Sequence, residues 1–376
     1  MKIRLFKPHL GKDELDAVKE VFDKSWIGLG PKVKEFEENW KKYINCKESI
    51  AVNSATAALH LSLAVFKFPE GKKVLVPSMT FSSTASAILY NRLEPVFVDS
   101  NSQTLGMCLN DLDKKYDKNC VAVMPVHYAG HPVPMDLLVT WARQRKLKII
   151  EDCSHTPASL YKGKRLGLWG DIGCYSFEEK KLMTTGDGGM ICSNDIDLLK
   201  NVRAMRWVGI DKDNWKSAKE YTAENHDALH WFYELRILGY KYNMNDLAAA
   251  IGIVQLRKLD KMNSIRSELI SEYMNSLKNN KFIDLLVPFE PKKYDYQMFG
   301  IRVNNKNETI IKLKNKGIAT GCHYTPLSIQ PLFLKWGKNC PYIEKEIDRC
   351  ITLPLHLGLS KNDVKYIVQE LNLINN

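Results

Sequence analysis

Short apolar runs alternate with helical patterns along the first two thirds of the chain. Apolar residues recur at helical spacing from Lys12 to Lys24, where Leu15, Val18, Val21 and Phe22 share one face, and again from Asn245 to Leu259. The apolar runs are typical of buried strands and cover residues 49–52, 73–76, 96–99, 121–126, 147–152, 172–177 and 190–193. Strands that alternate with helices favour a mostly parallel sheet with helices on both faces, so we expect an α/β fold.

The pattern changes near residue 262. Beyond it, strands predicted at 298–303 and 318–324 mix with helices at 308–316 and 361–371. We therefore expect a large domain over residues 1–262 and a small C-terminal α+β domain over residues 263–376. The stretch 204–238 is rich in tryptophan and charge and has no clear period, and we expect it to wrap a site or an interface.

Two lysines, Lys180 and Lys181, follow the strand run 172–177 and precede the glycine-rich turn 186–189. A lysine at the end of a strand can form a Schiff base with a carbonyl compound or an aldehyde cofactor if its surroundings lower its pKa. A lysine beside glycines is otherwise a solvated loop residue. The residues at two other strand ends decide between these readings.

The run 147–152 ends in Glu151 and Asp152, and the run 49–52 leads into Ser54, Ala55 and Thr56 at the start of a helical pattern. Ligands gather at the carboxyl ends of strands in open α/β sheets. A carboxylate there can keep a pyridinium nitrogen protonated. Small residues at a helix start, with free backbone N–H groups, bind phosphate. Lysine, carboxylate and phosphate cradle together predict a site for pyridoxal 5'-phosphate (PLP).

These residues resemble those of the DegT/DnrJ/EryC1/StrS family of PLP-dependent sugar aminotransferases. The most specific block is 176–189, where the family reads S-F-x-x-x-K-x-x-T-T-G-E-G-G, and alignment on Thr184, Thr185 and Gly186 selects Lys181 rather than Lys180. Further segments that match are 25–31, 76–81, 95–99, 125–130, 151–152, 239–246 and 323–327. The resemblance implies the aspartate-aminotransferase-like fold (fold type I). It also implies transfer of an amino group, with L-glutamate as the expected donor, to a ketone of a nucleotide-linked keto sugar in surface-glycan biosynthesis.

The resemblance also implies a role for individual residues. Lys181 is the catalytic lysine, and the substrate-binding residues are Trp26, His323 and Tyr324. The implied cofactor-binding residues are Ala55, Thr56 and Ser176 at the phosphate, Phe81 on the ring face, Asp152 at the ring nitrogen, His155 near the ring hydroxyl, and Lys241 reaching across a homodimer. For His155 the alternative is a core histidine, and for Lys241 a solvated lysine.

Some positions depart from the family pattern. Lys241 replaces an asparagine, and Ser328 replaces a histidine. The common R-x-H-G segment has Trp207 and Val208 at its two central positions. The departures at Trp207, Val208 and Ser328 lie on the substrate side and leave open a small phosphorylated ketone as the acceptor. A non-catalytic PLP-binding regulatory protein is a second alternative. A dehydratase of the same fold would carry histidine instead of Lys181, and a nicotinamide dehydrogenase would need a G-x-G-x-x-G fingerprint that residues 49–60 lack.

Composition agrees with a large enzyme of 376 residues and 45% hydrophobic content. The net charge of +11 is spread along the chain, which favours a solvated surface, or steering of an anionic substrate, over nucleic-acid binding. Nine cysteines without zinc or disulfide spacing predict no metal site and reduced thiols; Cys153 and Cys174 are expected to be packing residues. The start of the chain lacks a signal-peptide pattern, and no apolar run approaches the ~18 residues of a membrane helix, so we expect a cytoplasmic enzyme.

Overall fold

A seven-stranded sheet forms the centre of the larger lobe. The computed structural model describes residues 2–210, 235, 237–286, 295–337 and 339–375. The strands in chain order are β1 (Glu48–Val52), β2 (Lys73–Pro77), β3 (Glu94–Val98), β4 (Cys120–Val123), β5 (Lys148–Asp152), β8 (Ile172–Ser176) and β9 (Gly189–Ser193). They lie in the order β1-β9-β8-β5-β4-β2-β3, where β9 is antiparallel to both of its neighbours and all other pairs are parallel. The mostly parallel sheet is therefore confirmed.

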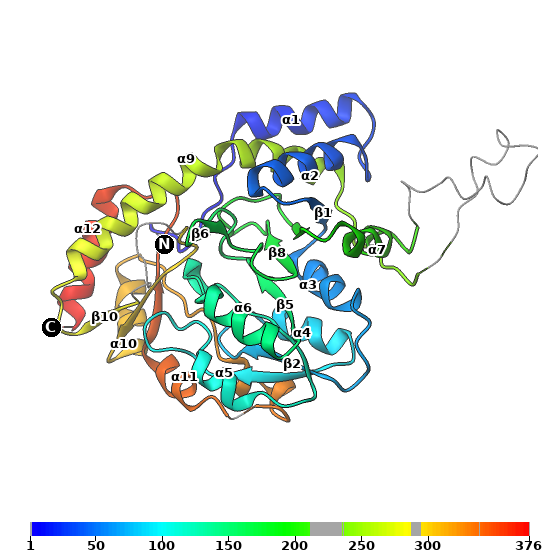
Figure 1. The fold of residues 1–376 in the computed structure, drawn as a ribbon. Helices are drawn as coiled ribbons and strands as arrows, with labels where there is room; N and C mark the ends of the chain where they lie inside the picture. The colour runs from blue at the N-terminus through cyan, green and yellow to red at the C-terminus, as the bar shows by residue number, and fades with distance from the viewer. Residues whose placement is uncertain (1, 211–234, 236, 287–294, 338, 376) are drawn as a thin grey trace, which may run out of the picture.

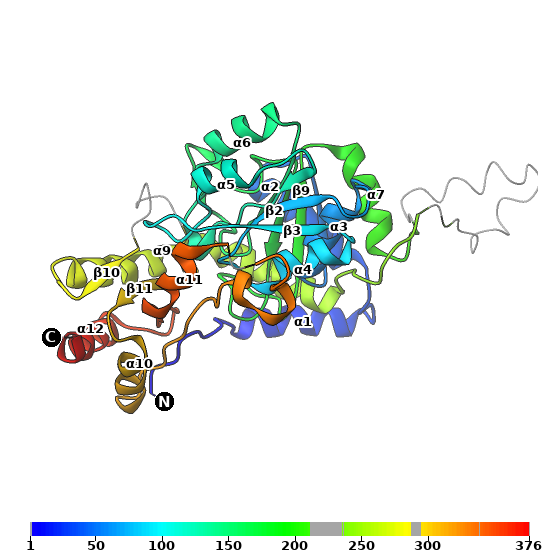
Figure 2. The same ribbon diagram turned by 90° about the horizontal axis from the view of Figure 1, so that it is seen from below.

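Helices cover both faces of this sheet (Figures 1 and 2). Alternate strand residues point to opposite faces: Val74 and Val76 join one apolar core, and Leu75 joins the other. The first core includes α3 (Ala55–Ala64), α4 (Ser82–Tyr90) and α7 (Ile196–Arg206). The second core includes α2 (Pro31–Ile44), α5 (Leu109–Lys115), α6 (Met135–Gln144) and part of α9.

The helix α9 (Asp246–Leu277) joins the two lobes and runs without a break through the predicted boundary at residue 262. Its first half packs against α1 (Lys12–Asp23) and α2, and its second half against α12 (Lys361–Asn375) (Figure 1). Asn245 caps the helix by accepting a hydrogen bond from the N–H of Ala248. The helix predicted from Asn245 is confirmed but is longer, because its second half takes its apolar partners from the smaller lobe.

The smaller lobe contains an antiparallel sheet of β10 (Ile283–Leu285), β11 (Phe299–Val303) and β12 (Cys350–Leu353), with helices α10 (Lys306–Asn315), α11 (Pro341–Glu346) and α12. The predicted strand over 318–324 is wrong. Only Ile318 and Gly321 form isolated bridges there, to Ile3 and Thr352. The segment pairs with two different partners because it leaves the sheet to reach the cavity described below.

Short elements complete the described chain: the hairpin β6 (Leu160–Tyr161) and β7 (Lys164–Arg165), and the 3-10 turns η1 (Tyr128–Gly130), η5 (Leu327–Ile329), η6 (Pro331–Phe333) and η7 (Ile347–Arg349). Most of the stretch 204–238, which we expected to wrap a site or an interface, lies outside the described residues. In the part of the chain that the structure describes, no helix combines the length and apolar character that crossing a membrane requires.

Candidate active site

A cavity of about 560 Å³ lies where β5 and β8 end and where α3 and α4 begin. The smaller lobe closes it with residues 297–298 and 322–324. The cavity therefore forms at the carboxyl edge of the parallel strands, as expected. Of the predicted residues, it brings together Ala55, Thr56, Phe81, Asp152, His155, Ser176, Lys181, His323 and Tyr324.

Lys181 projects from a tight turn after β8. The turn is held by the N–H groups of Lys181 and Thr185, which donate to the carbonyls of Glu178 and Phe177 at 2.9 Å each. Gly186 has a φ of +85°, which favours glycine there. Burial lowers the pKa of Lys181, although the carboxylates of Asp152 and Glu178 oppose this shift. A larger fraction of neutral amine is therefore present near pH 7 than for a solvated lysine.

Asp152 is buried at the end of β5 and held by two donors. The hydroxyl of Thr84 donates to its Oδ2 at 2.8 Å, and the N–H of Ser154 donates to its Oδ1 at 3.0 Å. Both contacts favour a fixed carboxylate that points into the cavity. Thr84 was not predicted as a site residue, although it stands one helical turn after Phe81 at the start of α4.

The N-terminus of α3 forms the opposite end of the cavity. Ser54 caps the helix by accepting a hydrogen bond from the N–H of Ala57 at 3.1 Å, and the hydroxyls of Thr56 and Ser83 lie 2.7 Å apart. β9 passes so close that a Cβ on Gly189 would lie 2.7 Å from the N of Ala55. Free N–H groups at such a helix start attract a phosphate dianion.

A third wall is built around His155. Its Nδ1 accepts a hydrogen bond from the N–H of Ala129 at 3.2 Å, so the neutral ring carries its proton on Nε2, 3.2 Å from the hydroxyl of Tyr324. The two rings stack with a centroid separation of 6.2 Å. Burial, aided by the ammonium of Lys181, holds the pKa of His155 well below its usual value, so the ring is neutral at pH 7. His155 is thus both buried and part of the cavity wall.

His323 lies next to this wall. Its Nδ1 is 3.0 Å from the hydroxyl of Thr352, and its ring meets that of Phe6 edge to face at 5.3 Å. Burial lowers the pKa of His323 to about 4. The cavity also takes in residues that the sequence did not single out: Phe6, Thr84, Glu178, Gln297 and Cys322. No local pattern marks Phe6 or Gln297, because both reach the cavity only through the packing of the smaller lobe.

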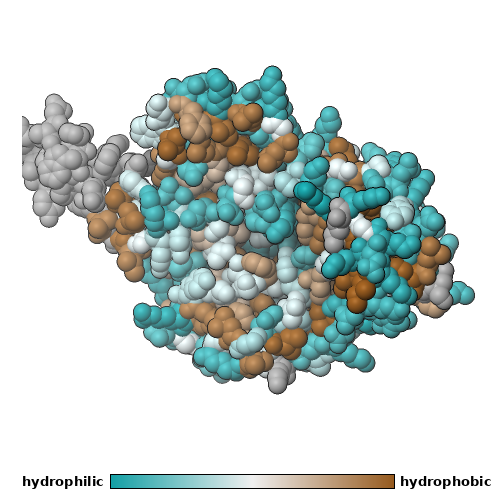
Figure 3. Space-filling model, turned by 180° about the vertical axis from the view of Figure 1, so that it is seen from behind, coloured by the Kyte–Doolittle hydropathy of each residue, from teal (hydrophilic) through white to brown (hydrophobic). Residues whose placement is uncertain are grey.

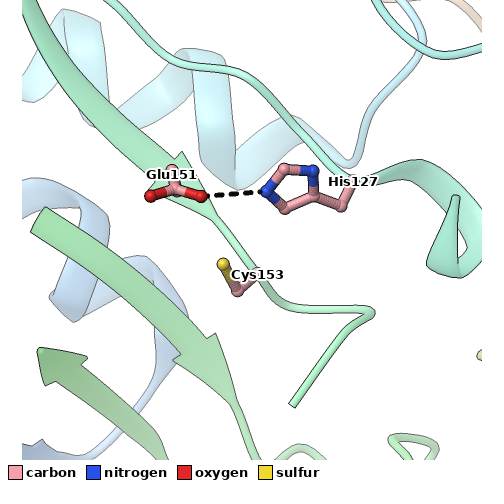
Figure 4. Close-up of side chains that lie close together, drawn as sticks. All are labelled: His127, Glu151 and Cys153. Atoms are coloured by element: carbon pink, nitrogen blue, oxygen red, sulfur yellow. Dashed lines mark hydrogen bonds and ion pairs between the residues drawn. The ribbon is translucent and has the colours of Figure 1, made fainter. Parts of the chain in front are cut away.

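A buried cluster of His127, Glu151 and Cys153 lies behind the end of β5 (Figure 4). The Nε2 of His127 is 3.2 Å from Glu151 Oε2, and the Nδ1 accepts a hydrogen bond from the N–H of Val133. The carboxylate of Glu151 also accepts hydrogen bonds from the N–H groups of Gly167 and Gly170. Burial raises the pKa of Cys153 well above its usual value, so the thiol stays protonated. The histidine and the carboxylate are thus engaged in hydrogen bonds that join three loops behind Asp152.

Two predicted site residues lie outside this cavity. Trp26 is exposed and donates to the carbonyl of Leu29, and Lys241 is exposed with its ammonium 5.5 Å from the ring centre of Trp207. None of the departures at Trp207, Val208 and Ser328 lines the cavity. Ser328 is fully buried, where its hydroxyl accepts from Ser78 and donates to Glu344.

The cavity fits PLP. Its volume is in the range of about 300–1,000 Å³ that small-molecule sites have. A helix N-terminus suits the phosphate, a buried carboxylate suits the ring nitrogen, and a lysine with a lowered pKa suits the aldehyde.

Comparison with known proteins agrees with this geometry. Residues 8–372 match the sequence model of the DegT/DnrJ/EryC1/StrS aminotransferase family. The chain is 32% identical to the spore coat polysaccharide biosynthesis protein SpsC of Bacillus subtilis (strain 168), over 96% of this chain and 94% of that protein. The aminotransferase TlmJ of Streptoalloteichus hindustanus has a similar structure, with a TM-score of 0.91 and 29% identity over 99% of this chain and 98% of that one. Spr1654 of Streptococcus pneumoniae, classed as a sugar aminotransferase and solved in its PLP form, has a TM-score of 0.89 and 26% identity over 100% of this chain and 99% of that one.

Proposed function

The chain belongs to the DegT/DnrJ/EryC1/StrS aminotransferase family, and from this membership we propose that it moves an amino group from L-glutamate to a ketone of a nucleotide-linked keto sugar. It is a PLP-dependent aminotransferase with the fold of the type I enzymes. One observation carries the proposal: Lys181, Asp152 and the N-terminus of α3 converge on one cavity. We propose surface-glycan biosynthesis as its role, which the similarity to SpsC supports.

PLP supplies an aldehyde and a ring that withdraws electrons from the substrate carbon. In the proposed mechanism the free N–H groups of α3 bind the phosphate, and Asp152 keeps a proton on the ring nitrogen. Thr84 and Ser154 orient that carboxylate. The Nζ of Lys181, neutral in part because burial lowers its pKa, would take the proton from the substrate carbon that bears the amino group and deliver it to the carbon that comes from the PLP aldehyde.

The positions that favoured a small phosphorylated ketone do not line the cavity of their own subunit. Ser328 is fully buried between Ser78 and Glu344, and neither Trp207 nor Val208 lines the cavity. Lys180, exposed at the cavity edge, offers a cation to an anionic substrate. These facts support the sugar nucleotide as the acceptor of this enzyme.

The test separates donor and acceptor. The enzyme is converted to its pyridoxamine form with L-glutamate, and keto sugars linked to nucleoside diphosphates are screened beside small keto phosphates for return of the absorbance of the PLP form. Return of this absorbance with keto sugars supports the proposal. Return with small phosphates alone would refute the sugar acceptor and leave the aminotransferase intact.

A homodimer completes the proposed site. Large apolar side chains are exposed on α1 and just after it: Leu15 (68%), Phe22 (62%), Trp26 (55%) and Ile27 (54%). Brown areas also gather at the level of α1 and α2 on the face seen in Figure 3. Such exposure is typical of a protein interface. We propose that Lys241 and Trp26, which lie outside the cavity of their own subunit, serve the cavity of the neighbour.

Complementation tests this arrangement. Lys181→Ala and Lys241→Ala subunits, each inactive alone, are mixed and allowed to exchange. In a two-fold dimer, half of the molecules become mixed and each regains one intact site, so about one site in four should recover. A mixture that stays inactive, or an active monomer in light scattering, would contradict the shared site.

A further inference from the structure

Gln297 crosses the wall of the cavity just before β11. Its side chain is 5% exposed and lines the cavity. Its backbone N–H donates to the carbonyl of Ala129 at 3.1 Å. The segment packs closely on Gly130, where a Cβ would lie 1.9 Å from the carbonyl oxygen of Asp295. These contacts fix Gln297 at the junction of the two lobes.

The orientation of the Gln297 carboxamide is determined by one contact. The Nε2 donates to the carbonyl oxygen of Lys180 at 2.6 Å. The flipped amide would place two carbonyl oxygens at that distance, which is repulsive. The Oε1 therefore takes the other position, where it is buried and accepts no hydrogen bond from any residue that the structure describes. Buried carbonyl oxygens normally have a donor, so this oxygen points to a bound ligand.

The chemistry of the oxygen restricts that ligand. A carboxamide oxygen is an acceptor only, so it repels the carboxylates of an amino acid donor and suits the hydroxyl of a sugar. We infer that Gln297 determines acceptor specificity, because its Oε1 accepts a hydrogen bond from a hydroxyl of the keto sugar. This hydroxyl lies near the reacting carbon, since the Nε2 of Gln297 contacts Lys180, the residue next to Lys181. This inference rests on the proposed function and specifies how the site recognises its acceptor.

The experiment uses Gln297→Met, which keeps the size of the side chain and removes both polar atoms. Holoenzyme in its pyridoxamine form is reacted with 3-keto and 4-keto 6-deoxyhexoses linked to nucleoside diphosphates, and with analogues that each lack one ring hydroxyl. We expect kcat/KM for the acceptor half-reaction to fall about tenfold, while the half-reaction with L-glutamate changes by less than about threefold. The wild type should react about tenfold more slowly with one deoxy analogue than with the complete sugar. With that analogue, Gln297→Met and the wild type should react equally fast.

Gln255→Met is the matched control. Gln255 is also a buried glutamine that donates at 2.8 Å, to His9 and Glu14, but it does not line the cavity. We expect this variant to change both half-reactions by the same factor. Equal losses in both half-reactions of Gln297→Met, or no analogue that abolishes its effect, would overturn the inference. So would a shifted PLP absorbance with unchanged acceptor selectivity. A wild-type enzyme inert to every keto sugar would instead refute the proposed function, and the inference with it.

Discussion

Replacing Glu151 by glutamine should destabilise the protein even though the shape of the side chain is kept. Glu151 is 0% exposed and accepts three hydrogen bonds: from Gly167 N at 2.8 Å, Gly170 N at 2.6 Å and His127 Nε2 at 3.2 Å. Glutamine has one acceptor oxygen. Its NH₂ group must face at least one of these donors, and His127 cannot adapt by moving its proton because its Nδ1 already accepts from the N–H of Val133.

The size of the effect follows from these contacts. Leaving one buried N–H unpaired costs about 1–3 kcal/mol, and the two remaining bonds each lose about 1 kcal/mol when the acceptor is no longer charged. Removal of a buried charge offsets part of this, so we expect a net loss of about 3 kcal/mol in the free energy of unfolding. With an unfolding entropy of about 2.1 cal/mol/K per residue, the midpoint of thermal unfolding should fall by about 4 °C.

The assay is urea unfolding of the cofactor-free protein at pH 7.5, followed by circular dichroism. Glu70→Gln is the control, because Glu70 is exposed and its ion pair with Arg92 is 3.5 Å long, so its loss should cost less than about 0.5 kcal/mol. If Glu151→Gln unfolds within about 1 kcal/mol of the wild type, the cluster behind Asp152 does not stabilise the fold as we argue.

Three further predictions concern the cofactor, acid stability and the position of Asp152. Borohydride should fix PLP covalently to Lys181 of the wild type. The Lys181→Ala variant should keep its fold, bind PLP reversibly and lose about a thousandfold or more in activity. Full activity of this variant would exclude Lys181 as the catalytic residue. Burial lowers the pKa of His131 to about 4, so the folded protein binds fewer protons than the unfolded chain between about pH 4 and 6.5 and loses stability as the pH falls through that range. His131→Phe, measured by urea unfolding, should therefore lose about 2–3 kcal/mol less than the wild type between pH 7.5 and 4.5, and equal losses would contradict the assignment. Thr84→Val should weaken PLP binding about tenfold in a titration of the apoenzyme, because Asp152 loses a donor at 2.8 Å; unchanged affinity would show that Ser154 alone orients the carboxylate.

Local pattern was sufficient for much of the fold and for the parts of the site that lie at strand ends. The seven strand runs could be recognised because burial on both faces of a parallel sheet produces continuous apolar segments. Ala55, Asp152 and Lys181 could be selected for a related reason: each lies at the end of such a run or a few residues beyond it, and the ends of neighbouring strands meet at one edge of the sheet. Local pattern did not separate Lys181 from Lys180; that choice came from the resemblance to the family motif, aligned on Thr184, Thr185 and Gly186.

Tertiary structure decided what the smaller lobe contributes. Phe6 and Gln297 have no sequence pattern of their own and reach the cavity because distant segments pack together, as when Gln297 bonds to Ala129 and Lys180. The segment 318–324 has the composition of a strand, but it pairs at only two positions before it carries His323 and Tyr324 into the cavity. The periodicity of apolar residues predicts which face of a helix or strand is buried. The partner of a buried polar atom depends instead on how elements far apart in the chain are brought together.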